Sequence, residues 1–342
     1  MPKFPAIRNF ILVGTVLCGA LLASSCAHPP TSDTSGAEVD DAVRSAVADE
    51  GSIVMARMNW TNQQINAELA RRVLTMMGAD VTTQSFDTST VFPAMSRANN
   101  VIDMEAWAPT AQAQIDEFVT KQSTVVKVGP TGYDGEEGWY VPTYVIKGDP
   151  SRGIEPSCPG LPDWRALNDC VEVFATSESE GKARYLSGDP AWEPLYGDQD
   201  RVKNLGLDVQ VDFAGSEAAL AAEWTRALER GEPMLGLIWR PHLITSKYDL
   251  TLIDLPPFTT ECWETTRACG WDNAPQNIYA SASFGSDHPV AEQFLKNYGL
   301  PIDSLNSIIV RIDGDGLTVE EAVDEWMKSN TALWQSWIPT TV

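Results

Sequence analysis

Histidine is scarce in this 342-residue sequence, which contains three His but twelve Trp. Metal sites and acid–base catalysis depend heavily on His, so the composition argues against both kinds of site. The sequence also lacks P-loop, GxGxxG, HExxH and GxSxG motifs, which are the usual signatures of nucleotide binding, zinc proteolysis and serine hydrolysis. We therefore predict a protein that is not an enzyme and has no metal, cofactor or catalytic residue.

Positive charge is scarce as well, because 24 Lys and Arg stand against 47 Asp and Glu and give a formal net charge of −23. A nucleic-acid backbone would be repelled, so we expect no nucleic-acid partner. A solvated surface explains this charge, and a bias toward cationic ligands is the weaker alternative. With 43% hydrophobic and 21% charged residues, the chain is globular and long enough for two domains or one bilobal domain. We expect a monomer.

The first 26 residues have the pattern of an export signal. Basic residues precede the apolar run FILVGTVLCGALLA at 10–23, which is short for a membrane span. ASSC then ends at Cys26, as in a bacterial lipobox, although Ala23 replaces the usual Leu. We predict lipid attachment at Cys26, on the outer face of the cytoplasmic membrane or in the periplasm, with an ordinary cleaved signal as the alternative. Residues 27–49 are predicted to be a flexible tether.

Four further cysteines follow in the exported part: Cys158, Cys170, Cys262 and Cys269. An even number of cysteines in an exported protein indicates disulfides. Sequence proximity favours the pairs 158–170 and 262–269, which is one of three possible connectivities. Metal binding is the alternative, but neither pair has CxxC spacing.

Two regions have the strand–helix–strand pattern of an α/β protein. The first region reads as strand, helix, strand, short helix and strand over 52–60, 61–80, 81–86, 89–100 and 101–107. The second reads as strand, helix and strand over 208–213, 216–231 and 233–241. This order predicts parallel strands covered by helices, with ligands at the carboxyl ends of the strands.

Tryptophan recurs where strand-like runs end, at Trp60, Trp107, Trp139 and Trp239. A single Trp at a strand end is usually a packing residue. Four of them at strand ends facing one cleft would suit a quaternary ammonium group, which has no N–H to donate. Each aromatic face attracts such a cation by about 0.5–2 kcal/mol.

The other end of such a ligand would need polar partners. Asn62 stands at the start of the first helix, where backbone N–H groups could hold a carboxylate or hydroxyl, but it can equally serve as the helix N-cap. His242 follows Trp239 by three residues and could donate to a carboxylate, although a structurally satisfied His is the alternative.

The order of several motifs resembles the substrate-binding proteins of glycine betaine, proline betaine and choline ABC importers. These motifs run over most of residues 50–340 and include IDMEAWAPT, GWYVPTYV, YLSGDPAWE, GSEAALAAEW, IWRPH and LTVEEAVDEWMKSN. The resemblance implies an α/β, bilobal periplasmic-binding-protein fold of type II, the Venus-flytrap arrangement, with two lobes and a hinge. We place lobe I at 50–145 and 253–342, and lobe II at 146–252.

The resemblance also implies a function. A quaternary ammonium ligand, most simply glycine betaine, with choline, proline betaine or carnitine as other options, would be bound by a tryptophan cage. It would then be delivered to a permease with an ATPase subunit. Trp60, Trp107 and Trp239 match cage positions, and either Trp139 or Trp192 completes the set. Asn62 stands where choline binders carry an acidic residue, which favours betaine-like ligands.

Two other functions fit parts of the sequence. In a secreted hydrolase of the glycosidase type, aromatic rings would stack on sugar and Asp103 and Glu105, on one strand face, would form a carboxylate pair. A solvated or ion-paired strand end is the simpler explanation of these acids. A ligand-sensing module for a separate membrane receptor is the third possibility.

Overall fold

The computed structural model describes residues 39–108, 110–272 and 274–340, which belong to one compact unit. The predicted signal segment, the lipidation site at Cys26 and residues 27–38 of the predicted tether lie outside the described residues. None of the helices in the described ranges is long and apolar enough to cross a membrane.

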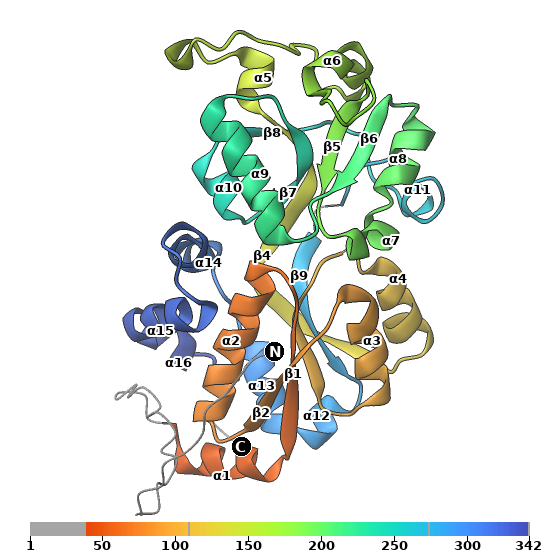
Figure 1. Cartoon of the computed structure of the whole chain (residues 1–342). Helices are drawn as coiled ribbons and strands as arrows, with labels where there is room; N and C mark the ends of the chain where they lie inside the picture. The colour runs from red at the N-terminus through yellow and green to blue at the C-terminus, as the bar shows by residue number, and fades with distance from the viewer. Residues whose placement is uncertain (1–38, 109, 273, 341–342) are drawn as a thin grey trace, which may run out of the picture. The chain divides into compact units, whose positions relative to one another are not determined.

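The strands of the described residues follow the order β2-β1-β3-β9-β4-β7-β5-β6, and β8 pairs with β4 (Figure 1). Their bounds are β1 Ser52–Arg57, β2 Asp80–Ser85, β3 Val101–Ala106, β4 Val125–Pro142, β5 Ala183–Ser187, β6 Val209–Phe213, β7 Leu235–Arg240, β8 Leu250–Leu252 and β9 Ala274–Ser281. β1 pairs in parallel with β2 and β3, and β5 pairs in parallel with β6 and β7, as the strand–helix–strand pattern predicts. β9 and β4 add antiparallel pairs.

The long strand β4 belongs to both halves of the sheet. Residues 125–135 pair with β9, and residues 136–142 pair with β7 and β8. We call the half with β1, β2, β3 and β9 lobe I, and the half with β5, β6, β7 and β8 lobe II. The chain therefore enters lobe II between Gly135 and Glu136, about ten residues earlier than the sequence predicted.

The return to lobe I also lies elsewhere than predicted. After β8 the chain stays in lobe II, where Trp263 of α11 (Thr260–Thr265) is buried 5.7 Å from the Arg201 guanidinium of α8. Only β9 brings it back to lobe I. The pairing of β4 thus places the first crossing within this strand, whose alternation does not reveal where its partners change, and the second crossing lies between α11 and β9.

Helices of lobe I cover the strands in the lower half of Figure 1. Their bounds are α1 Asp41–Asp49, α2 Thr61–Met76, α3 Thr88–Arg97, α4 Gln112–Gln114, α12 Phe284–Asp287, α13 Pro289–Asn297, α14 Ile302–Ile309, α15 Val319–Ser329 and α16 Thr331–Gln335. Those of lobe II, besides α11, are α5 Thr143–Lys147, α6 Val171–Phe174, α7 Glu193–Tyr196, α8 Asp198–Leu205, α9 Glu217–Arg230 and α10 Leu243–Lys247.

Helix α1 corrects the predicted tether, whose last residues are folded. The Asp40 side chain accepts a hydrogen bond from Ala42 N at 2.7 Å and caps the helix. Val39, Val43 and Val47 are buried in the core of lobe I. Their spacing of four residues is helical, but it is embedded in an acidic, small-residue stretch that resembles a linker.

Two disulfides lie in lobe II. Cys158 pairs with Cys170 and Cys262 pairs with Cys269, with Cα–Cα distances of 5.8 and 6.3 Å. This is the pairing that sequence proximity favours. The first bridge anchors the loop-rich segment before β5, and the second closes the turn after α11.

Candidate functional site

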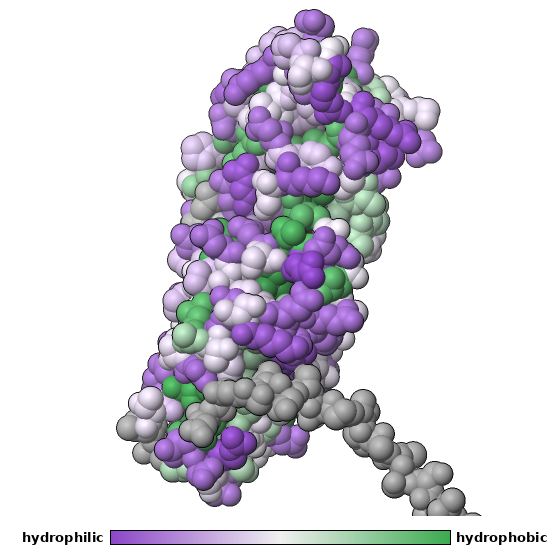
Figure 2. Space-filling model, turned by 90° about the vertical axis from the view of Figure 1, so that its left-hand side faces the viewer, coloured by the Kyte–Doolittle hydropathy of each residue, from purple (hydrophilic) through white to green (hydrophobic). Residues whose placement is uncertain are grey.

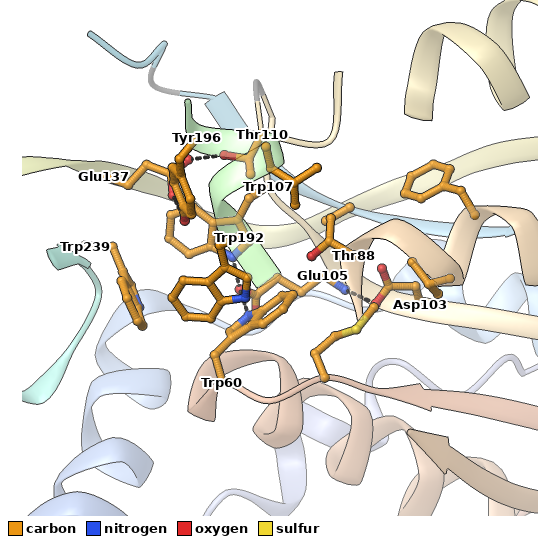
Figure 3. A pocket seen from close by; sticks show the side chains of 15 residues that line it. Trp60, Thr88, Asp103, Glu105, Trp107, Thr110, Glu137, Trp192, Tyr196 and Trp239 are labelled. Atoms are coloured by element: carbon orange, nitrogen blue, oxygen red, sulfur yellow. Dashed lines mark hydrogen bonds between the residues drawn. The ribbon is translucent and has the colours of Figure 1, made fainter. Parts of the chain in front are cut away.

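Four indole rings from the two lobes line one pocket (Figure 3). Trp60 and Trp107 belong to lobe I, and Trp192 and Trp239 belong to lobe II. The pocket holds about 530 Å³ of space free of atoms, its open mouth included. Figure 2 shows apolar side chains gathered at mid-height, between the two lobes, with hydrophilic side chains around them.

The rings reach this pocket because each stands near the carboxyl end of a strand, and the strands of the two lobes run toward each other at the junction of the lobes. Trp107 comes directly after β3, and Trp60 comes shortly after β1, which runs parallel to β3. Trp239 is the next-to-last residue of β7, and Trp192 lies in the helical turn Pro190–Trp192 that follows β5. Carboxyl ends of parallel strands are where ligands bind in α/β sheets.

The rings form the walls of a box. Trp192 contacts Trp60 edge-on across the lobes, with centroids 6.4 Å apart, and contacts Trp239 edge-on at 5.9 Å. Tyr196 packs against Trp192 from one side, with ring centroids 6.1 Å apart. Each of the four indoles is at most 9% exposed, so the box is shielded from bulk water.

Glu105 anchors the two indoles of lobe I. Its Oε1 accepts hydrogen bonds from Nε1 of Trp60, at 3.2 Å, and from Nε1 of Trp107. Its Oε2 accepts from the Tyr133 hydroxyl at 2.6 Å and from Asn66 Nδ2 at 3.1 Å. Burial raises the pKa of Glu105 to about 7, although these hydrogen bonds counteract the rise.

Two more buried acids line the pocket, one at each end of the view in Figure 3. Glu137 accepts hydrogen bonds from Thr110 Oγ1 at 2.5 Å and from the Tyr196 hydroxyl at 2.8 Å. Asp103 accepts one from Gln63 Nε2 at 3.1 Å. Burial raises the pKa of each acid to about 7.

The lining is acidic and aromatic. Among the described residues that line the pocket there is no Lys, Arg or His. The described ranges also contain no group of three or more His, Cys, Asp and Glu side chains that could hold a metal ion. The arrangement therefore suits a small group that is cationic and apolar at its surface.

The sequence of the chain matches the family described as the substrate-binding domain of the ABC-type glycine betaine transport system over residues 51–329. The chain belongs to this family. The predicted resemblance is thus confirmed. Over 301 residues the chain is 28% identical to the trimethylamine N-oxide-binding protein of Pelagibacter ubique (strain HTCC1062), covering 85% of this chain and 92% of that protein.

Solved structures agree with the fold of this family. The glycine betaine, L-proline-binding protein of an ABC transporter from Borrelia burgdorferi superposes with a TM-score of 0.66 at 16% identity, covering 84% of this chain and 97% of that one. An ABC-transporter choline-binding protein in complex with choline gives 0.66 at 17% identity, with 85% and 93% covered. The predicted bilobal type II periplasmic-binding-protein fold is therefore confirmed.

Trp139, one of two candidates for the fourth ring of this substrate-binding domain, lies outside the pocket. Its side chain is fully buried in lobe II, where Nε1 donates to Asp198 Oδ1 at 3.0 Å and the ring packs on Tyr185 at 4.4 Å. Trp192, the other candidate, lines the pocket. On β4, Trp139 is two residues deeper into lobe II than Glu137, which is the last β4 residue to reach the pocket.

Asn62 and His242 also lie outside the pocket, although both stand between the lobes. Asn62 Nδ2 donates to Pro241 O of lobe II at 2.9 Å. His242 Nδ1 accepts from Ile244 N at 3.1 Å and so caps α10, while its Nε2 lies 3.4 Å from Glu217 Oε1. The structure thus gives these residues roles in helix capping and lobe contact.

Sequence reasoning missed several lining residues of this binding domain. Asp103 and Glu105 were noticed only as a carboxylate pair. Glu137 carries no signal, since the Trp two residues later on β4, Trp139, lies outside the pocket. Tyr196 and Thr110 carry no signal, because each lies in a loop or short helix whose position depends on the packing of the lobes.

Proposed function

We propose that this substrate-binding protein holds a small methylated ammonium compound among Trp60, Trp107, Trp192 and Trp239. After closing, it would deliver the compound to an ABC permease with an ATPase subunit, from a lipid anchor at Cys26. The observation that carries the proposal is the convergence of four indoles from two lobes on one acid-lined pocket. A fully methylated ammonium group has no N–H to donate, and aromatic faces attract it by about 0.5–2 kcal/mol each.

The acid lining bears on which compound is held. A betaine carboxylate would meet buried acids and no cationic side chain, which disfavours glycine betaine, proline betaine and carnitine. A neutral carboxyl group on Glu137 could donate to an N-oxide oxygen, and its charged form could accept from the choline hydroxyl. We therefore propose trimethylamine N-oxide first and choline second, ahead of the glycine betaine that the sequence favoured. The name of the relative from Pelagibacter ubique supports this order.

The glycosidase-like alternative is less well supported. Its carboxylate pair would need Glu105 free to exchange a proton with a substrate. In the structure the Glu105 carboxylate accepts four hydrogen bonds, two of them from indoles of the pocket. Holding the rings accounts for this acid without a reaction.

Titration calorimetry with trimethylamine N-oxide, choline and glycine betaine tests the proposal. We expect saturable binding, and a loss of about 1–3 kcal/mol on Trp107→Ala, Trp192→Ala or Trp239→Ala. Trp164→Ala is the matched control, because Trp164 lies outside the pocket and stacks on Arg165. Full affinity in all three pocket variants would rule out the cage.

Glu137→Gln separates the two leading ligands. An amide always offers a donor, whereas Glu137 with a pKa of about 7 has lost its proton at pH 8. At pH 8 we expect the variant to bind trimethylamine N-oxide several-fold more tightly than the wild type and choline several-fold more weakly. Equal shifts for both ligands would contradict the assigned contact.

A further inference from the structure

Two glycines stand directly behind two rings of the pocket. Gly135 lies in β4 at the crossing between the lobes, behind Trp107, and Gly188 follows β5, behind Trp192. Neither is among the glycines with positive φ, so their backbone conformations are open to other residues. Conformational freedom therefore does not explain why a side chain is missing at these positions.

Close approach of the indoles does explain it. A Cβ atom on Gly188 would lie 2.5 Å from Cε3 of Trp192. A Cβ atom on Gly135 would lie 2.7 Å from Cη2 of Trp107 and 2.5 Å from Gln276 Nε2. All these separations are shorter than carbon atoms in contact adopt, so a methyl group at either position must move the ring.

Contacts with other residues limit how the two rings can move. Trp107 is held at its N–H by Glu105, and Trp192 is bounded by Trp60 and Tyr196. A methyl group behind either ring would therefore push it toward the pocket. In a close-packed interior, even one added methylene group is felt by its neighbours.

We propose that Gly135 and Gly188 are positioning residues that set the width of the cage and so the size of the ammonium group it admits. This inference rests on the proposed function. One glycine sits behind a lobe I ring and the other behind a lobe II ring, so each lobe sets one wall. A side chain at either position would narrow the cage. It would weaken the binding of an ammonium group with four methyl groups more than the binding of a smaller ammonium group.

The width of the cage can be measured by the ratio of the affinities for a larger and a smaller methylammonium ion. Calorimetry on the intact protein would compare tetramethylammonium with dimethylammonium for the wild type, Gly135→Ala and Gly188→Ala. We expect the ratio to fall about tenfold in either variant, or about 1.4 kcal/mol, because the added methyl group crowds the larger ion. A general loss of folded protein would lower both affinities equally and leave the ratio unchanged.

Gly129→Ala is the matched control, since Gly129 lies on the same strand β4 and a Cβ there would meet nothing within 4 Å. Its ratio should equal that of the wild type. A double-mutant cycle adds a test that does not depend on stability. Trp192→Phe shortens the ring in front of Gly188, so Gly188→Ala should change the ratio much less in that background.

The outcomes separate the two proposals. If the wild type binds tetramethylammonium but both alanine variants keep its ratio, the role of the glycines is overturned and the cage stands. An equal effect of Gly188→Ala with Trp192 and with Phe at 192 would also overturn it. If the wild type binds neither these ions nor trimethylamine N-oxide nor choline, the proposed function itself fails.

Discussion

The two lobes hold their halves of the pocket in different ways. In lobe I, Trp60 and Trp107 donate to the same carboxylate oxygen of Glu105. In lobe II, Trp192 and Trp239 are positioned by edge-on ring packing, and no described residue accepts a hydrogen bond from Trp239 Nε1. Directional hydrogen bonds fix a ring more tightly than apolar contacts do. Lobe I therefore presents a preset wall, whereas the wall of lobe II depends on its neighbours.

Local geometry explains the difference. Glu105 precedes Trp107 by two residues, so the two side chains leave the β3 segment on the same face. Trp60 follows the neighbouring strand β1 and meets the same acid from the side. In lobe II the β5 and β7 ends carry no acid of this kind within the pocket; the lobe II acid, Glu137, comes from β4 and accepts from Tyr196 and Thr110 instead.

Glu105→Ala removes the hydrogen bonds that distinguish lobe I from lobe II. It should have the largest effect on stability and on ligand binding. It removes the acceptor of two indoles, Tyr133 and Asn66, and leaves buried donors unpaired. We expect a loss of at least about 3 kcal/mol in the free energy of unfolding, together with loss of ligand binding. Urea unfolding measures the first and calorimetry the second. Glu105→Gln keeps one acceptor oxygen and should retain part of both; a wild-type midpoint for Glu105→Ala would contradict the assigned role.

Glu217→Ala tests the contact between the lobes. The N-cap residue of α2, Trp60, has no side-chain acceptor, and Glu217 of lobe II accepts from Thr61 N at 2.8 Å and Thr61 Oγ1 at 3.1 Å. The acid thus caps a lobe I helix only when the lobes meet. Since a cap contributes about 1 kcal/mol, we expect roughly fivefold weaker ligand binding.

The control for this prediction lies on the same helix. Glu223 of α9 is half-buried and pairs with Arg226 of the same helix, so Glu223→Ala should leave affinity unchanged. Small-angle scattering with saturating ligand would show whether the Glu217→Ala protein still becomes compact. If both variants bind like the wild type, the contact does not contribute to closing.

Asp103→Asn should change how the stability of lobe I depends on pH and leave the contact between the lobes as it is. Burial raises the pKa of Asp103 from its ordinary 3.8 to about 7 in the folded protein. The folded state then keeps a proton that the unfolded state has released, so this contribution to stability is full below about pH 4 and is lost as pH rises through 7. Asparagine does not titrate, so the Asp103→Asn protein does not lose this stability as the pH rises.

The raised pKa corresponds to a difference of about 2–3 kcal/mol in favour of Asp103→Asn at pH 8 relative to pH 5. Thermal unfolding of both proteins across this range measures it. A constant difference between the two melting curves would show that Asp103 is ionised throughout.

Much of lobe I follows from local pattern. The strands β1, β2 and β3 and the helix α2 lie within a few residues of their predicted bounds, because buried strands and an amphipathic helix carry strong periodic signals. Thr318 and Glu321, which stand three residues apart in the sequence, form a capping box at the start of α15. Asn62 was a candidate for the N-cap of α2, but Trp60 occupies that position and the acceptor, Glu217, comes from the other lobe.

The sequence by itself determined the α/β class, the family likeness and the presence of tryptophans after strands, and it favoured the disulfide pairing that forms, because these depend on residue type and short spacing. Tertiary structure alone decided that Trp192 rather than Trp139 lines the pocket, that β4 joins both lobes, and that Glu105 ties two indoles together. Those facts depend on where a continuous strand changes partners and on contacts between residues far apart in the chain, which no local pattern records.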